Sequence, residues 1–238
     1  MQCSLFDFKD LERNRDIPVA VYLPNSPKDM LPVVIWGPGY QGQDDLKKEE
    51  PVYKSYTFLA EYFTKKGFAF VSIQHDILGD SDGLETVDHT AIQDDARRHL
   101  YERGQANILF TIEQLKQEEL PLNFNQIVLG GHSNGGDITK YFINNNSSVT
   151  QKAILFDARR AKLKPKMPLS VLMFEADDTT TDSGVIADPI QGNNAMRANL
   201  DLKVIKPSGA LHASYSDDFI DKKLKQNIFD CLDWFLKI

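Results

Sequence analysis

One short stretch of the sequence combines the residues that covalent catalysis would need. Residues 126–129 (QIVL) are apolar and typical of a buried strand, GHSNG follows at 131–135, and a helical pattern comes next. A serine on a tight turn between a strand and a helix exposes its hydroxyl at the positive end of that helix, and the flanking glycines let strand and helix pack closely. This pattern predicts Ser133 as the nucleophile of an acyl-transfer reaction.

A serine hydroxyl is a weak nucleophile unless a base accepts its proton, so a histidine must lie nearby in the fold. His212 follows a strand-like run at 202–205 and a turn at 207–209, and it precedes a C-terminal helical pattern. That is the chain order expected when the acid lies between serine and histidine. We therefore expect His212 to be the base. The remaining histidines precede the serine or belong to its motif: His75, His89, His99 and His132.

The acid that orients the imidazole has three candidates. Asp177 and Asp178 both end the apolar run 169–176, and Asp157 ends the preceding strand. Each would stand at the carboxyl end of a strand, where a carboxylate can stabilise the charged imidazole. We favour Asp178, with Asp157 and Asp177 as alternatives.

Two backbone amides must stabilise the oxyanion of the tetrahedral intermediate. The amide of Asn134, directly after the serine, is the first. A glycine-rich loop at 37–42 follows an apolar strand and offers the second, which we assign to Tyr40 because Pro38 has no N–H. Gln41 is the alternative donor.

The same loop matches G-x-G-x-x-G, the fingerprint of dinucleotide-binding oxidoreductases. That fingerprint requires a helix that opens at the glycines so that its N-terminus meets the pyrophosphate. Here QDDLKKEEP follows, and Pro51 comes before any apolar periodicity. We therefore interpret the glycines as part of an oxyanion loop and keep the oxidoreductase only as a rival class.

Apolar runs alternate with helical patterns along the chain, which predicts a doubly wound, mostly parallel sheet in one α/β domain spanning residues 1–238. Residues 17–23 read as an antiparallel edge strand. The helix at 54–66 should end at Gly67, and the last helix should begin at a capping Ser216. The predicted parallel strands are 32–36, 69–73, 126–129, 153–156, 169–174 and 202–205, and the predicted helices are 54–66, 91–119 and 216–238.

Composition excludes several other classes of function. The chain has 238 residues, 42% hydrophobic and 26% charged, and a formal net charge of -7 without a dense Lys/Arg cluster, so nucleic acid is not an expected partner. No apolar stretch approaches the roughly 20 residues of a membrane span, and no leader pattern opens the chain. The sequence as written predicts a cytoplasmic protein, or a secreted one if a leader has been removed. Cys3 and Cys231 are expected to be free thiols.

The serine motif, the glycine-rich loop and His212 together resemble the α/β-hydrolase superfamily over nearly the whole chain. Residues 36–42, 100–115 and 212–217 are similar to bacterial dienelactone-hydrolase-like proteins and to the platelet-activating-factor acetylhydrolase group. The resemblance implies a serine esterase that needs no metal or cofactor. The resemblance to the acetylhydrolase group implies that the acid is at the position of Asp157. The resemblance to cutinase-like and dienelactone-type proteins implies instead that it is at the position of Asp178. Dienelactone hydrolases proper use a cysteine nucleophile, so Ser133 argues against that chemistry.

The segment 157–168, where this fold often carries a lid, is short and charged, so we expect no sizeable lid domain and an open site suited to small soluble esters. Tyr40, Tyr215 and the loop 75–82 are candidate substrate contacts. A different hypothesis is that the chain has lost catalysis and serves as a binding protein of the same fold. The intact Ser133 and His212 argue against it.

Overall fold

The computed structural model describes residues 1–27, 29–185 and 199–237. Its centre is one eight-stranded sheet with the order β1-β2-β4-β3-β5-β6-β7-β8. β1 pairs antiparallel with β2, β2 pairs antiparallel with β4, and the other pairs are parallel. The strands are β1 Gln2–Asp10, β2 Arg15–Leu23, β3 Leu31–Gly37, β4 Ala69–Ile73, β5 Leu122–His132, β6 Thr150–Phe156, β7 Leu169–Phe174 and β8 Leu200–Ile205.

The central strands are apolar on both faces because helices cover both faces. Successive side chains of a strand point to opposite sides. In β3, Val33 and Ile35 belong to one buried cluster, whereas Val34 and Trp36 belong to the other. The sheet therefore separates two hydrophobic cores, and its strands read as continuous apolar runs in the sequence.

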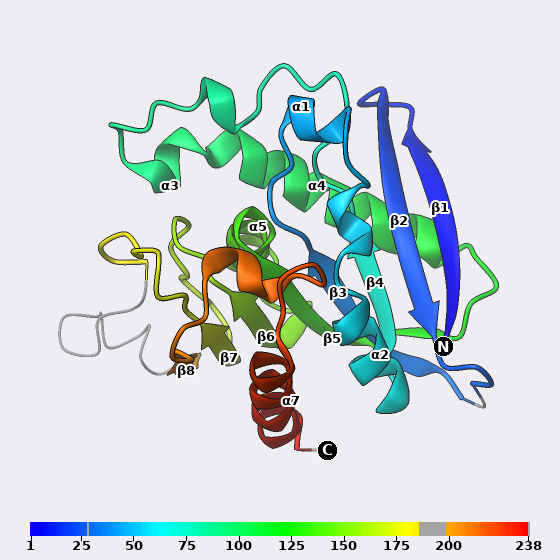
Figure 1. Ribbon diagram of the computed structural model, residues 1–238. Helices are drawn as coiled ribbons and strands as arrows, with labels where there is room; N and C mark the ends of the chain where they lie inside the picture. The colour runs from blue at the N-terminus through cyan, green and yellow to red at the C-terminus, as the bar shows by residue number, and fades with distance from the viewer. Residues whose placement is uncertain (28, 186–198, 238) are drawn as a thin grey trace.

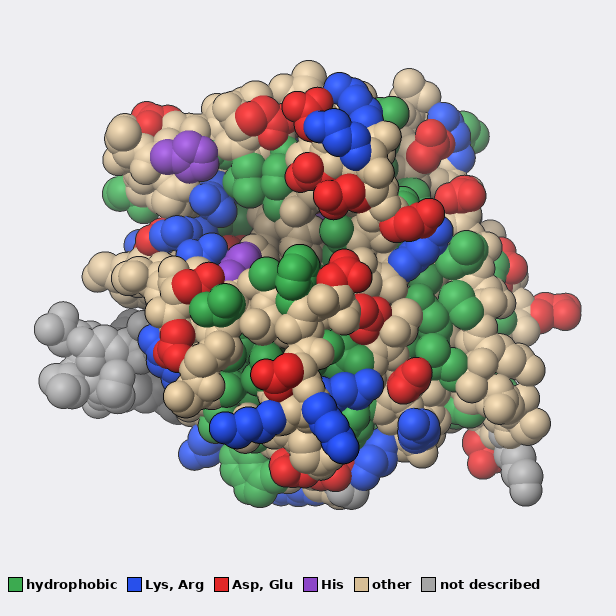
Figure 2. All heavy atoms as spheres, viewed as in Figure 1, with side chains coloured by type: hydrophobic (Ala, Val, Ile, Leu, Met, Phe, Trp, Pro, Cys, Tyr) green, Lys and Arg blue, Asp and Glu red, His purple; other side chains and the backbone are tan. Residues whose placement is uncertain are grey.

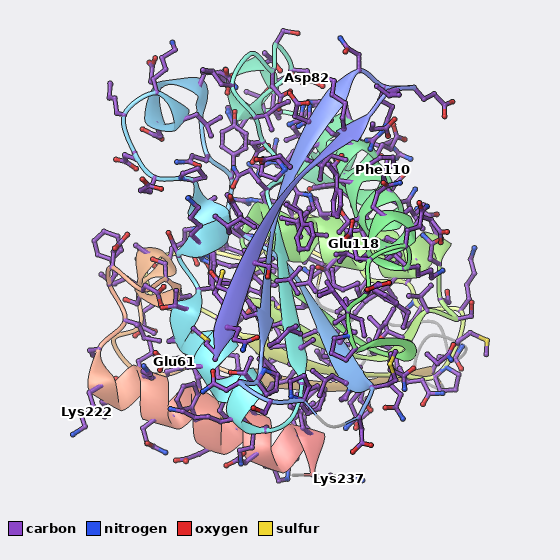
Figure 3. The ribbon with its side chains drawn as sticks, turned by 90° about the vertical axis from the view of Figure 1, so that its right-hand side faces the viewer. Glu61, Asp82, Phe110, Glu118, Lys222 and Lys237 are labelled. Carbon is purple, nitrogen blue, oxygen red and sulfur yellow. The ribbon has the colours of Figure 1, made fainter. Side chains whose placement is uncertain are left out.

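Each core is closed by its own pair of long helices. α4 (Arg98–Leu115) and α5 (Asn134–Asn145) contribute to the first cluster, and α2 (Thr57–Lys65) and α7 (Lys222–Leu236) to the second. Figure 1 shows α2 and α7 in front of the strands and α4 behind them. The view turned by 90° places Phe110 of α4 and Lys222 of α7 on opposite sides of the sheet (Figure 3). The short helices are α1 Gln43–Leu46, η1 Val52–Lys54, η2 Leu84–Thr86, α3 Gln93–Ala96 and η3 His212–Tyr215.

The predicted parallel sheet in a doubly wound α/β arrangement is confirmed, and residues 69–73 and 169–174 have the predicted bounds. The predicted position of the edge strand is wrong, because residues 17–23 lie in β2 and the edge of the sheet is β1. The side chains of β1 are mostly exposed, so its sequence contains no apolar run that would reveal it. The predicted helix 91–119 is two helices, α3 and α4, which meet at Arg97.

Helix ends follow the predicted rules with one exception. Gly67 directly follows the C-cap of α2 and has a φ of +83°. The last helix is capped by Asp221, which accepts a hydrogen bond of 2.7 Å from the amide of Leu224, and not by Ser216. Ser216 instead donates to the carbonyl of Ala213 in the turn before the helix.

The connection between β6 and β7 is short, as predicted, and no lid domain is present among the described residues. None of the described helices combines the length and apolar character that crossing a bilayer requires.

Candidate active site

Ser133 occupies the tight turn that the motif predicts. It follows the last residue of β5 and is the N-cap of α5, with φ +53° and ψ −122°. A positive φ is disfavoured for any residue with a Cβ and costs roughly 1–3 kcal/mol. Its amide donates to the carbonyl of Phe156, at 2.8 Å, which fixes the turn to the end of the neighbouring strand. The serine side chain is left partly exposed at the start of α5.

Glycines allow the turn at Ser133, called the elbow below, to pack against the loop that follows β3. A Cβ at Gly131 would lie 2.4 Å from the carbonyl carbon of Gly135, and a Cβ at Gly135 would lie 2.1 Å from the carbonyl oxygen of Gly37. Both distances are far below van der Waals contact. The end of β3 and the start of α5 therefore touch through backbone alone.

This contact brings the glycine-rich loop next to the serine. A Cβ at Gly39 would lie 3.7 Å from the Cβ of Ser133. Neither the Tyr40 amide nor the Asn134 amide donates a hydrogen bond within the described part of the chain. The Gln41 amide, the alternative donor, is already bonded to Asp76 Oδ2 at 3.3 Å. The geometry thus favours Tyr40 and Asn134 as the free donors.

His212 opens η3 and leans over the elbow. Its ring centroid is 4.8 Å from that of His132, the residue before the serine. Nδ1 of His212 lies 2.5 Å from Oδ2 of Asp157, directly after β6. No hydrogen bond joins Ser133 to His212 among the described residues, which is common before a substrate is bound. Nε2 of His212 makes no hydrogen bond with the described residues.

The contact with the imidazole ring is made by Asp157 and not by Asp178, the acid that the sequence favours. Asp178 is exposed, and its Oδ1 accepts a hydrogen bond of 2.7 Å from the main-chain amide of His212, not from the ring. Asp177 accepts from the Gly209 amide at 2.6 Å. The alternative Asp157 has the ring contact, because it stands at the end of a strand that lies nearer to the serine.

The carboxylate of Asp157 is well supplied with donors. Besides His212, it accepts hydrogen bonds from the amide of Ala176 at 3.0 Å and from the hydroxyl of Thr179, and Nε of Arg159 lies 3.2 Å from Oδ2. Burial acts to raise the pKa of Asp157, but these donors and the positive charges outweigh it and hold the pKa below its ordinary value. Asp157 therefore stays ionised at neutral pH.

A tyrosine that no sequence motif singled out ties the two loops together. The hydroxyl of Tyr56 accepts a hydrogen bond of 3.1 Å from the Gly39 amide and lies 2.9 Å from Nδ1 of His132. Burial, followed by the charge of His212, lowers the pKa of His132 to about 3, so this histidine is neutral. Its Nδ1 can accept the tyrosine proton. Only the three-dimensional structure reveals this link, since Tyr56 lies in an unremarkable segment before α2.

Charged groups beneath the glycine-rich loop hold it from the other side. Asp76 accepts from Arg103 at 3.0 Å as well as from Gln41, and Arg15 pairs with Asp80 at 2.6 Å. Burial raises the pKa of Asp76 to about 6 although Arg103 opposes the shift. The predicted substrate loop 75–82 thus begins as a buried support.

Two other predicted substrate contacts also serve structural roles. Tyr215 is fully buried, and its hydroxyl donates to the carbonyl of Glu175 at 2.8 Å, so it cannot line the mouth of the site. Tyr40 donates through its hydroxyl to Glu85 at 2.5 Å, which ties its side chain to η2.

No family model matches the chain, and no curated protein matches it. The fold does match solved structures. Esterase 2 of Thermogutta terrifontis is 17% identical with a TM-score of 0.63 over 99% of this chain and 94% of its own. A thermostable esterase is 16% identical with a TM-score of 0.59, over 96% of this chain and 62% of its own. A Bacteroides ovatus chain of the dipeptidyl aminopeptidase IV type is 14% identical with a TM-score of 0.64, over 99% and 35%. The chain has the α/β-hydrolase fold.

The backbone contact at the elbow gives a first prediction. Gly135→Ala should lower the free energy of unfolding by about 1–3 kcal/mol, because the new methyl group has no space beside Gly37. Gly42→Ala is the matched control, since its Cβ would meet no atom closer than 3.7 Å. Urea unfolding of both variants measures the difference. Equal urea midpoints for Gly135→Ala and Gly42→Ala would show that the loop after β3 is not in close contact with Gly135.

Buried His75 gives a second prediction. Neither of its ring nitrogens has a hydrogen-bond partner among the described residues, and burial together with Arg15 and Arg103 lowers its pKa to about 3. As pH falls below about 6.5, the unfolded chain takes up a proton on this ring and the folded chain does not, so stability is lost. Between pH 7 and 5 the parent should lose about 2 kcal/mol more than His75→Leu.

Unfolding in urea at both pH values measures this loss. His99→Leu is the control, because its imidazole is partly exposed and its Nε2 donates a hydrogen bond of 3.0 Å to the carbonyl of Asp82. It should follow the parent. A His75→Leu curve parallel to the parent curve would show that the buried ring titrates normally.

Proposed function

We propose that this chain is a serine hydrolase that cleaves carboxylic ester bonds. Ser133 is the nucleophile, His212 the general base and acid, and Asp157 the carboxylate that orients the imidazole. The observation that carries the proposal is the contact of 2.5 Å between His212 and Asp157 above a serine on a strained turn. A structural serine would need neither the positive φ nor the adjacent pair.

The chemistry follows from the position of each group. Ser133 Oγ attacks the acyl carbon while Nε2 of His212 takes its proton, and the imidazolium is stabilised by ionised Asp157. The oxyanion accepts hydrogen bonds from the amides of Tyr40 and Asn134. His212 then returns the proton to the leaving alcohol. Water cleaves the acyl-enzyme by the same route and restores Ser133.

Two features of the site favour small esters with short acyl groups over large or strongly apolar substrates. Ser133 is partly exposed, and the short β6–β7 connection leaves the site open among the described residues. Structures of the Thermogutta esterase with propionate and with butyrate bound are among those with a similar fold. These are short acyl groups of the kind an open site would accept.

The first test is labelling by a fluorophosphonate. The same Thermogutta esterase is phosphonylated by cyclosarin, which makes this chemistry a suitable probe for the fold. The parent should be labelled and should hydrolyse p-nitrophenyl acetate, because both reactions need an activated serine. Ser133→Ala and His212→Ala should lose both. Absence of labelling in a folded parent would favour a binding protein instead.

The identity of the acid gives a separate prediction. Asp157→Asn should lower kcat for p-nitrophenyl acetate by about 10³- to 10⁴-fold, because an amide at this position cannot stabilise the imidazolium. Asp178→Asn is the matched control: it touches the same histidine, but through the main chain, and should cost less than about tenfold. Steady-state kinetics of the two variants decides between them. The reverse order would assign the acid to Asp178.

A further inference from the structure

Three arginines lie near one another, and one of them, Arg159, contacts the catalytic acid that we propose. Arg159 and Arg160 follow Asp157 almost directly, and Arg97 stands at the junction of α3 and α4. Arg97 and Arg160 line a cavity of about 440 Å³, together with His89, Gln93, Asp182 and Ser183. Figure 2 shows Lys or Arg side chains and a histidine gathered beside a hollow on this face, between α3 and η3. Of these arginines, the mechanism described above involves only Arg159, whose charge helps to keep Asp157 ionised.

Their charges are not fully compensated within the described part of the chain. Arg160 pairs with Asp182, yet its Nε is buried without a hydrogen-bond partner. Arg159 faces Asp157, whose carboxylate is already shared with His212. Among the described residues, Asp157 and Asp182 are the only carboxylates within ion-pair distance of these three guanidinium groups, and Asp157 is shared with His212.

Arg97 is the guanidinium with the weakest pairing. Its Nε donates to Gln93 at 3.0 Å, and no carboxylate of the described residues lies within ion-pair distance of it. Burial lowers the pKa of Arg97, and the nearby charges of Arg159 and Arg160 act in the same direction, against Asp137. A partly buried cation without an anion is costly, and an incoming carboxylate or phosphate would relieve that cost.

The cavity is also rigidly fixed to the catalytic elbow. The amide of Arg160 donates to Asp137 Oδ1 at 3.0 Å, and Asp137 lies in the first turn of α5, directly behind Ser133. Lys140, fully buried on the same helix, donates to the carbonyl of Ala158 at 2.7 Å. An anion held between Arg97 and Arg160 would thus have a constant position relative to the serine and the Asp157–His212 pair.

We propose that this cavity binds a carboxylate carried by the substrate, so that the preferred substrates are esters with a free acid group, such as half-esters of aliphatic dicarboxylic acids. The inference rests on the proposed ester hydrolysis and specifies its substrate class. Guanidinium groups suit this task because their planar donors match the two oxygens of a carboxylate.

The experiment compares monomethyl adipate with dimethyl adipate, which share the reacting ester and differ in one charge. The diester has two ester groups, so its kcat/KM is first divided by two. For the parent, kcat/KM of the half-ester should exceed this corrected value by about tenfold. Arg97→Gln should remove this advantage and leave the diester rate unchanged. Arg98→Gln is the control, since Arg98 is exposed and paired with Asp95, and it should change neither rate. Raising the salt concentration should weaken only the half-ester reaction.

Binding of monomethyl adipate to Ser133→Ala, measured by calorimetry, separates this inference from the proposed function. If monomethyl adipate binds and Arg97→Gln abolishes this binding, the subsite is supported. If no ester is hydrolysed in addition, only the proposed ester hydrolysis is refuted. Ser133-dependent diester hydrolysis without a half-ester preference and without this binding would overturn the subsite alone. An equal loss in Arg97→Gln and Arg98→Gln would also overturn it, because general surface charge would then explain the effect.

Discussion

The close approach of two glycines is the constraint on which the candidate site depends. Gly37 ends β3 and pairs in register with Gly131 of β5, so the two strand ends lie side by side. α5 starts immediately after β5, and its Gly135 touches the Gly37 carbonyl through backbone alone. The same contact brings Gly39 of the loop next to Ser133, where a Cβ at Gly39 would lie 3.7 Å from the serine Cβ. Tyr56 and Asp76 then hold the loop from two directions.

The strained turns that present the site are stabilised by a regular device. Ser133 and Asp157, on neighbouring strands, both have positive φ. The amide of each donates to the last carbonyl of the next strand, Ser133 to Phe156 and Asp157 to Phe174, and Glu175 continues the series to Ile205. The parallel ladder therefore extends one residue beyond the strand ends. These hydrogen bonds offset part of the roughly 1–3 kcal/mol that each turn costs, and they fix both turns to the sheet.

Sequence reasoning succeeds where burial leaves a continuous pattern. β4 and β7 are buried on both faces, and their limits follow from the apolar runs. β1 has no such run because an edge strand needs only one partner, and most of its side chains face solvent. The break at Arg97 is also invisible in the sequence, since the helical periodicity continues across it. The serine motif predicts the local geometry because the close packing of strand and helix requires both the flanking glycines and the strained turn.

The choice of acid could not be made from the sequence for a geometric reason. β6 and β7 are adjacent and parallel, and Asp157 and Asp178 follow their carboxyl ends, so residue types alone leave either carboxylate able to approach one imidazole. In the structure both do reach His212: Asp157 holds its ring and Asp178 holds its main-chain amide. Which one meets Nδ1 depends on the path of the turn at 207–211, a path that residue types alone do not determine.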